Sequence, residues 1–578
     1  MVLLCVWACG GGSGGADGAE QDPGAEPDPG EHTEVVPLAL LSAPAGLCDG
    51  DAAPKECSNP AGCETSDDYG YGDPGIAASG GSGSYEEGGA SGGGVGGAGA
   101  TSVGGAGATS VGGEGGEGGE LAGGAPGLGK LKFSTQQANS ACEGLDRENP
   151  ATLYLSADDS SSMASPVIAR HLIRSGQRVA AGLVRPYEFL NYYDFSFEPA
   201  EKGKVRVVPQ LSSCPVDGAL SFQVALQSET REAEQRAPLN LTLVLDTSGS
   251  MAGTPLELEQ AAVRAIAGQL KAGDVVSVVT WNTDQRELLT AHDVEGTPDA
   301  ALLGVAEALQ AGGGTDLDGG LRRGYELAQE QFSTERINRV VVVSDGIANV
   351  GETNAEMIAS HANDEEGGSG IYLAGVGVGD GVNDTLLNVV TDAGRGAYIY
   401  LDSEDEAEKM LGDRFLSVID VAARAVRLEL TLPWYFQVQK FYGEAISTDA
   451  SKVYPQHLGP NDAMLFFQIL QACDSSLING ADTIQLRATW ETPFTREARA
   501  FASELSLNDL AGSDATLAKA AAIAGYAEAL VAADLAPDAG RRSAVLRRAI
   551  DNVLAVPQHA SDPDLVEVLG LLEAYRGE

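Results

Sequence analysis

Basic residues are scarce in this chain. Its 578 residues include 36 Lys and Arg against 83 Asp and Glu, a formal net charge of −47 at pH 7. Nucleic acids and anionic membrane surfaces attract positively charged protein faces, so this balance argues against both as direct partners and we expect no nucleic acid. The acidic surface favours solubility and attracts divalent cations diffusely.

Residue types that build active sites are also few. The chain has six His, no His-Glu-x-x-His motif, and no Gly-x-Ser-x-Gly motif outside its glycine-rich stretches. Catalysis requires a nucleophile, a base or an activated water held by identifiable groups. We therefore predict that the protein is not an enzyme, and a metal-dependent hydrolase is the less favoured alternative.

Long apolar runs are missing from the rest of the chain. Beyond the first nine residues, no stretch has the roughly 18 continuous apolar residues of a membrane-spanning helix. The chain begins with an apolar run that ends in Val6-Trp7-Ala8-Cys9. This ending resembles the lipobox of bacterial lipoproteins, although the run is short and lacks a basic start. The resemblance implies a lipid on Cys9 and an exported protein anchored in the cell envelope. Glycine after Cys9 favours the outer membrane.

Cysteine is rare, with eight in the whole chain. If Cys5 is removed and Cys9 carries lipid, six remain: Cys48, Cys57, Cys63, Cys142, Cys214 and Cys473. An even number in an exported protein permits three disulfides, but the pairing cannot be read from sequence. Cys48, Cys57 and Cys63 could form a small knot. Zinc is disfavoured, because no Cys-x-x-Cys pair occurs.

Low-complexity sequence fills residues 10–131, after the signal-like residues 1–9. Gly, Ala, Ser, Asp and Glu dominate, and the octapeptide 95–102 is repeated at 103–110. Such composition predicts a flexible, disordered tether, with a root-mean-square reach of roughly 60 Å for about 120 residues. Its expected role is to hold the folded part away from the anchor.

Three separated segments of the globular part offer oxygen ligands. The apolar run Leu241–Leu245 ends in Asp246-Thr247-Ser248-Gly249-Ser250, and a second apolar run, Val340–Val343, ends in Ser344-Asp345-Gly346. Between them, a glycine-rich turn carries Thr315. Hydroxyls with only two carboxylates suit a hard divalent cation, Mg²⁺ above all, with Mn²⁺ or Ca²⁺ as alternatives.

This pattern resembles the metal-ion-dependent adhesion site of von Willebrand factor type A (VWA) domains: Asp-x-Ser-x-Ser, then a Thr, then Asp-Gly after a hydrophobic strand. The resemblance implies that the hydroxyls of Ser248, Ser250 and Thr315 bind the metal directly. It implies that Asp246 and Asp345 act largely through water. The remaining coordination position then belongs to an Asp or Glu carboxylate of a protein partner.

Residues 239–420 alternate strand and helix patterns. Strands are expected at 240–246, 274–281, 339–344, 371–376 and 397–401, and helices at 256–270, 298–310, 317–331, 354–363, 383–393 and 404–420. Continuous apolar strands alternating with helices predict an α/β fold with a mainly parallel sheet covered on both faces. Ligands of such sheets bind beyond the carboxyl ends of the strands, where the oxygen motif lies.

Two further domains are expected to flank this one. Residues 132–238 and 421–578 are predicted as an N-terminal associated domain and a C-terminal β-sandwich-like domain with two or three helices. The sequences at 153–158 and 185–193 resemble an extension found in bacterial VWA lipoproteins. Asp158 begins a near-copy of the Asp-x-Ser-x-Ser motif, which we interpret as a polar turn because no matching Thr turn or Asp-Gly follows.

The leading hypothesis combines the metal motif, the lipobox-like start and the tether. It is an envelope-anchored adhesion or protein-interaction module whose Mg²⁺ coordinates a partner's carboxylate. The alternative is a structural or assembly component of an envelope complex.

Overall fold

A computed structural model describes residues 142–213, 218–346, 370–512 and 515–577. Cys9, the tether, four of the six candidate disulfide cysteines and the helix expected at 354–363 lie outside these residues. Strand order, helix boundaries and packing refer to these four ranges.

A six-stranded sheet forms the centre of the α/β region, in the order β6-β5-β4-β7-β8-β9. All neighbours are parallel except β5 and β6. The strands are β4 (Leu239–Asp246), β5 (Val275–Trp281), β6 (Gln285–Asp293), β7 (Ile337–Ser344), β8 (Tyr372–Val378) and β9 (Tyr398–Leu401). Five were predicted. The sequence did not reveal β6, because this largely exposed edge strand lacks an apolar face.

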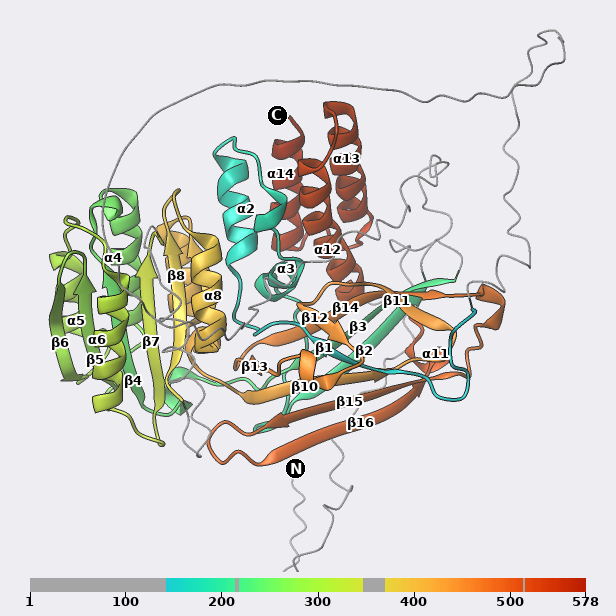
Figure 1. The fold of residues 1–578 in the computed structure, drawn as a ribbon, viewed down its shortest axis with the longest axis horizontal. Coiled ribbons are helices and arrows are strands. Elements are labelled where there is room, and N and C mark those ends of the chain that lie inside the picture. Colours follow the sequence, from blue (N-terminus) through green and yellow to red (C-terminus); the bar gives the residue numbers. More distant parts are fainter. Residues whose placement is uncertain (1–141, 214–217, 347–369, 513–514, 578) are drawn as a thin grey trace, which may run out of the picture. The chain divides into compact units, whose positions relative to one another are not determined.

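Helices cover both faces of this sheet, as predicted (Figure 1). They are α4 (Thr254–Ala267), α5 (Ala300–Ala308), α6 (Leu317–Glu330), α8 (Asp384–Gly394), α9 (Glu404–Glu408) and α10 (Phe415–Ile419), with a π-helical turn at Lys409–Asp413. Alternate β4 residues face opposite layers: Leu243 belongs to the core under α4, and Val244 to the core under α6. Gly324 lets α6 lie directly on Val244, where a Cβ would clash.

Two antiparallel sheets form the flanking region. The first has the order β12-β1-β10-β15-β16, with β13 also on β10, and the second is β11-β14-β3-β2. Their strands are β1 (Thr152–Ser156), β2 (Arg206–Ser213), β3 (Ala219–Gln227), β10 (Ala423–Thr431), β11 (Phe436–Phe441), β12 (Ala445–Ser447), β13 (Gln456–Leu458), β14 (Ala463–Ala472), β15 (Thr483–Glu491) and β16 (Ala498–Ser506).

The two flanking segments differ from the expectation of separate domains, because their strands share both sheets. β1 pairs with β10 from Thr152↔Thr431 onward, and β3 pairs with β14 over nine residues, Ala219–Gln227. One apolar core lies between the sheets and contains residues from both segments, such as Phe222 and Phe466. Neither half has enough strands to cover its own apolar face, so the α/β region is an insertion within one β-sandwich.

The disulfide Cys142–Cys473 also joins the two flanking segments across 331 residues of sequence. The sequence had left the cysteine pairing open. Cys473 follows β14 directly, so the bridge fixes the beginning of the described chain beside the second sheet.

Helices from both flanking segments pack together. They are α2 (Ala164–Arg174), α3 (Pro186–Tyr192), α12 (Ala515–Asp534), α13 (Ala539–Ala555) and α14 (Pro563–Gly577), preceded by the short α11 (Leu507–Leu510). Among the described helices, only α12 is long and apolar enough to cross a membrane. Its most apolar window is 56% buried inside the protein, and Phe189 of α3 stacks edge-on against Tyr526, as in a core helix.

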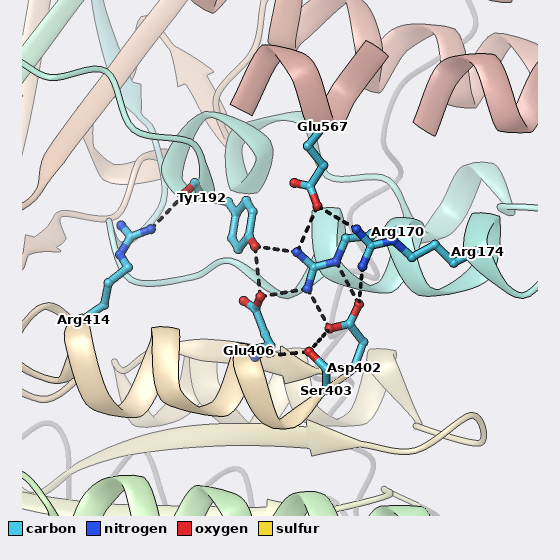
Figure 2. A network of polar contacts seen from close by, with 8 residues as sticks. All are labelled: Arg170, Arg174, Tyr192, Asp402, Ser403, Glu406, Arg414 and Glu567. Atoms are coloured by element: carbon cyan, nitrogen blue, oxygen red, sulfur yellow. Dashed lines mark hydrogen bonds and ion pairs between the residues drawn. The ribbon is translucent and has the colours of Figure 1, made fainter. Parts of the chain in front are cut away.

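Arg170 of α2 connects this helical layer to the α/β region (Figure 2). Its guanidinium donates to Asp402 (2.6 and 2.8 Å) and Glu406 (2.7 Å), which stand at the start of α9. It also donates to the Tyr192 hydroxyl at 2.7 Å and lies 3.5 Å from Glu567 of α14. The side chains of Arg170, Asp402 and Glu406 are almost completely buried, so α9 is fixed by charge to both flanking segments.

Candidate functional site

Asp246 is the last residue of β4, next to β7 in the middle of the sheet. The chain leaves β4 toward β5 on one side and later returns to β7 on the other, which makes this the switch point where open α/β sheets bind ligands. The carboxylate is buried and accepts hydrogen bonds from the Ser248 amide (2.8 Å) and the Ser344 hydroxyl (2.7 Å). Burial, together with the nearby charge of Asp345, raises the pKa of Asp246 to about 6.

Ser248 and Ser250 lie in the loop that follows β4. Their hydroxyl oxygens are 3.1 Å apart, with Ser248 buried and Ser250 exposed to solvent. The Gly249 amide donates to the carbonyl of Gly313 (3.3 Å), and the Gly312 amide donates to that of Thr247 (2.8 Å). The predicted glycine turn is therefore held against the serine loop.

Thr315 follows that turn and is solvent-exposed. The next residue, Asp316, caps α6 by accepting from the Gly319 amide at 3.1 Å. The threonine is thus placed between a fixed turn and the start of a helix, on the same edge of the sheet as the two serines.

Asp345 directly follows β7 and is 2% exposed. Leu245 pairs with Val343, so Asp246 and Asp345 leave adjacent parallel strands at the same edge. Gly346 has φ +69, and a Cβ there would lie 2.8 Å from the Asn383 amide nitrogen. The turn after Asp345 therefore requires glycine, which accounts for the Asp-Gly pair in the sequence.

Glu259 of α4 is a site residue that the sequence analysis missed. It is fully buried, and neither carboxylate oxygen has a hydrogen-bond partner among the described residues. Burial raises its pKa well above the usual range, and the charges of Asp246 and Asp345 raise it further. One signal was available, because a glutamate among the apolar positions of an amphipathic helix breaks the pattern.

This donor set fits a hard divalent cation. An acidic side chain without a partner, beside two buried carboxylates, is energetically unfavourable unless it is protonated or a positive charge lies close by. Among the described residues no three His, Cys, Asp or Glu side chains gather tightly enough to form a metal cluster by themselves. A cation at this edge therefore depends on hydroxyl oxygens, which Ser248, Ser250 and Thr315 supply.

The near-copy of the motif at Asp158 has a different environment. Its residues form a turn, as predicted, but this turn is buried, and Asp158 has φ +69. Asp159 accepts a hydrogen bond from the His457 amide, and the Ser160 hydroxyl accepts one from the Gly459 amide at 3.0 Å. These side chains bind the backbone around β13, so this motif has a structural role in joining β1 to the rest of the sandwich.

Comparisons with known proteins bear on the α/β region. A family model described as the von Willebrand factor type A domain matches residues 240–413. The chain is 26% identical over 299 residues to the protein YfbK of Escherichia coli (strain K12), which covers 49% of this chain and 50% of YfbK. It is 28% identical over 212 residues to the protein sll0103 of Synechocystis sp., which covers 36% of this chain and 49% of sll0103. The chain thus spans about half the length of these relatives.

Among solved structures, the fold is similar to a von Willebrand factor type A protein from Catenulispora acidiphila. The match covers 73% of this chain and 90% of that one, at 13% sequence identity and a TM-score of 0.41.

Proposed function

Because this chain contains a von Willebrand factor type A domain, we propose that it is a protein-binding module of the bacterial cell envelope that recognises a carboxylate of its partner through a divalent cation. The observation that carries the proposal is the meeting of Asp246, Asp345, Ser248 and the glycine turn at the switch point of the sheet. Three segments that lie far apart in the sequence bring these groups to one edge of the sheet. A single polar turn of the chain would not do so.

The residues of the site have different tasks in this proposal. The hydroxyls of Ser248, Ser250 and Thr315 would hold the cation directly, and Asp246 and Asp345 would act on it largely through water. Mg²⁺ held mostly by neutral oxygens keeps Lewis acidity toward an additional anionic oxygen. Since Ser250 and Thr315 are exposed, a partner's Asp or Glu can reach this edge of the sheet from solvent.

Metal-dependent capture tests this function. We expect a Mg²⁺-loaded bait, exposed to cell-surface and envelope extracts, to retain at least one protein that EDTA elutes. A Thr315→Val bait should retain at least tenfold less of it, because one hydroxyl ligand is lost. Thr290→Val, which removes an exposed hydroxyl from the distant edge strand β6, is the matched control and should behave as wild type.

The competing assembly role gives a different result. If the same envelope proteins stay bound in EDTA and bind equally to Thr315→Val, the metal site does not recognise the partner. The protein is then a structural component of an envelope complex. Quantitative mass spectrometry of the EDTA eluates distinguishes the two outcomes.

The envelope location is part of the proposal and rests on Val6-Trp7-Ala8-Cys9. We expect the native protein to sediment with outer membranes, and Cys9→Ser to move it into the soluble fraction, since one thioether-linked lipid is lost. An unchanged distribution of the variant in membrane fractionation contradicts lipid anchoring at Cys9.

A further inference from the structure

Positive charge is concentrated on α13, in the helical layer. The helix has one acidic residue, Asp551, and its four arginines are Arg541, Arg542, Arg547 and Arg548. The whole chain has 83 acidic residues against 36 basic ones, so an arginine on its surface readily finds a carboxylate. None of these four arginines forms an ion pair within the described ranges. The positive charge of α13 is therefore not neutralised there.

Most of these arginines lie on the side of α13 that faces solvent. The helix packs mainly against α12 and α14 (Figure 1). Its buried residues are Leu546, Ala549, Ile550 and Val553. Arg541, Arg547 and Arg548 are exposed. Arg541 and Arg548 are seven residues apart, which is about two turns, so they lie on the same side of the helix. The three exposed arginines thus form a basic face along α13.

A groove of about 380 Å³ adjoins the start of α13. Its walls come from the segment after α2, the end of α12 and the first turn of α13. Four of the lining residues are Gly or Ala, and the others are Arg178, Asp538 and Arg542. Arg178 pairs with Asp534 at 2.6 Å, and Asp538 caps α13. The guanidinium carbon of Arg542 lies 4.2 Å from the ring centroid of Tyr575. Small walls leave room for a side chain of a partner.

Large apolar side chains are exposed at both ends of α13. Leu535, just after α12, is 50% exposed, Leu554 in the last turn of α13 is 44% exposed, and Val566 in the first turn of α14 is 51% exposed. Leu554 is seven residues after Arg547 and so lies on the same side of the helix. Single exposed apolar residues are common, but these stand at the two ends of a basic helix about 25 Å long. The surface is therefore basic along its length and apolar at its ends.

We propose that the solvent-facing side of α13 is a second docking surface, which binds an elongated acidic segment of a protein partner. Carboxylates of the segment pair with Arg541, Arg547 and Arg548, because guanidinium groups form paired hydrogen bonds with carboxylates. Apolar side chains of the segment contact Leu554 and Val566 at one end and enter the groove at the other. A flat bilayer cannot fill a groove, so the surface fits a protein segment better than an anionic membrane. Docking here does not involve the metal site.

Fluorescence anisotropy with a labelled peptide tests this surface on the full chain. EDTA is present throughout, so that no metal can bind the carboxylates of the peptide. The probe is a helical peptide of Glu, Ala and Leu with about 18 residues, close to the length of α13. We expect it to bind at about 50 mM NaCl and at least tenfold more weakly at about 300 mM, because salt screens exposed ion pairs. The same peptide with Gln in place of every Glu should also bind at least tenfold more weakly.

Arg547→Gln combined with Arg548→Gln should weaken binding of the Glu peptide about tenfold, because two exposed ion pairs are lost. The matched control is Arg322→Gln combined with Arg499→Gln. It also removes two arginine charges, from side chains that are 49% and 43% exposed on α6 and β16, and it should bind the peptide as wild type does.

Four outcomes overturn the proposal. The Glu peptide does not bind at low salt, or the Gln peptide binds equally well. Binding is unchanged by the Arg547 and Arg548 substitutions, which places the peptide elsewhere. Both double variants weaken binding equally, which means that net charge alone matters. In a separate arm, phosphatidylglycerol vesicles bind wild type but not the Arg547 and Arg548 variant while the Glu peptide binds neither, which makes this face a membrane surface.

Discussion

Saturating Mg²⁺ is expected to raise the melting temperature of the wild-type protein by roughly 5–10 °C, and Asp246→Asn is expected to abolish this rise. A ligand at 100 times its dissociation constant stabilises the native state by about 2.7 kcal/mol. For a folded region of about 180 residues, each kcal/mol corresponds to about 2–4 °C. Asn keeps the size of the side chain but loses the charge that the cation requires.

Asp318→Asn is the matched control for this experiment. Asp318 is an exposed carboxylate on α6 that pairs with Arg322 four residues later, so its loss should leave the Mg²⁺-induced shift intact. Differential scanning calorimetry with and without EDTA measures both effects. Equal shifts in wild type and Asp246→Asn remove Asp246 from the metal site.

Glu259→Met removes a buried carboxylate from the same site. Its expected effect on the stability of the metal-free protein is an increase. Without metal, removal of an unpartnered buried acid should stabilise the protein by about 1–4 kcal/mol, because an apolar side chain replaces it at similar volume. The Mg²⁺-induced shift should then become smaller, since less repulsion between carboxylates remains for the cation to relieve. A less stable metal-free variant contradicts this account of Glu259.

Arg170→Met should destabilise the protein at neutral pH by about 3–5 kcal/mol. Met retains the apolar stem, but Asp402 and Glu406 lose their counterion while they stay buried. Arg174→Met, one turn further along α2, is the control. Its side chain is 56% exposed, 3.1 Å from Glu567 and 3.9 Å from Asp402, so this solvent-screened arginine should contribute below about 1 kcal/mol (Figure 2).

The effect of Arg170→Met should also depend on pH. Burial alone raises the pKa of Asp402, but the hydrogen bonds and charge of Arg170 hold it below its ordinary value. A depressed carboxyl pKa contributes stability that is present above the unfolded pKa, near 3.8, and is lost as the pH falls through the folded pKa. Without Arg170, burial raises the pKa of Asp402 above its ordinary value, so the difference between wild type and Arg170→Met should be larger at pH 7 than at pH 4 and should shrink further as the pH falls. Chemical denaturation at both pH values measures it.

A constant difference across that range would contradict the assignment of Arg170 as the counterion of Asp402. The loss would then come from packing of the arginine stem, which does not titrate.

Local patterns were enough to predict the α/β region and the edge of its sheet where Asp246 and Asp345 lie. A buried strand must be apolar along its length, so β4 and β7 were recognisable, and the polar residues that end them follow at once in the chain. Parallel strands bring their carboxyl ends to one edge, which made the proximity of Asp246 and Asp345 a consequence of fold class. The edge strand β6 escaped detection, since an exposed strand has no such constraint.

Features that depend on distant pairing became known only from the packed molecule. No local pattern states that Thr152 of β1 lies beside Thr431 of β10 or that Cys142 bridges to Cys473, because the partners lie 279 and 331 residues apart. The Asp158 motif has the same residue spacing as the motif that begins at Asp246. Its side chains instead accept hydrogen bonds from backbone amides around β13. Glu259 acquired its significance from burial beside Asp246 and Asp345, and burial is a property of the packed molecule rather than of the residue.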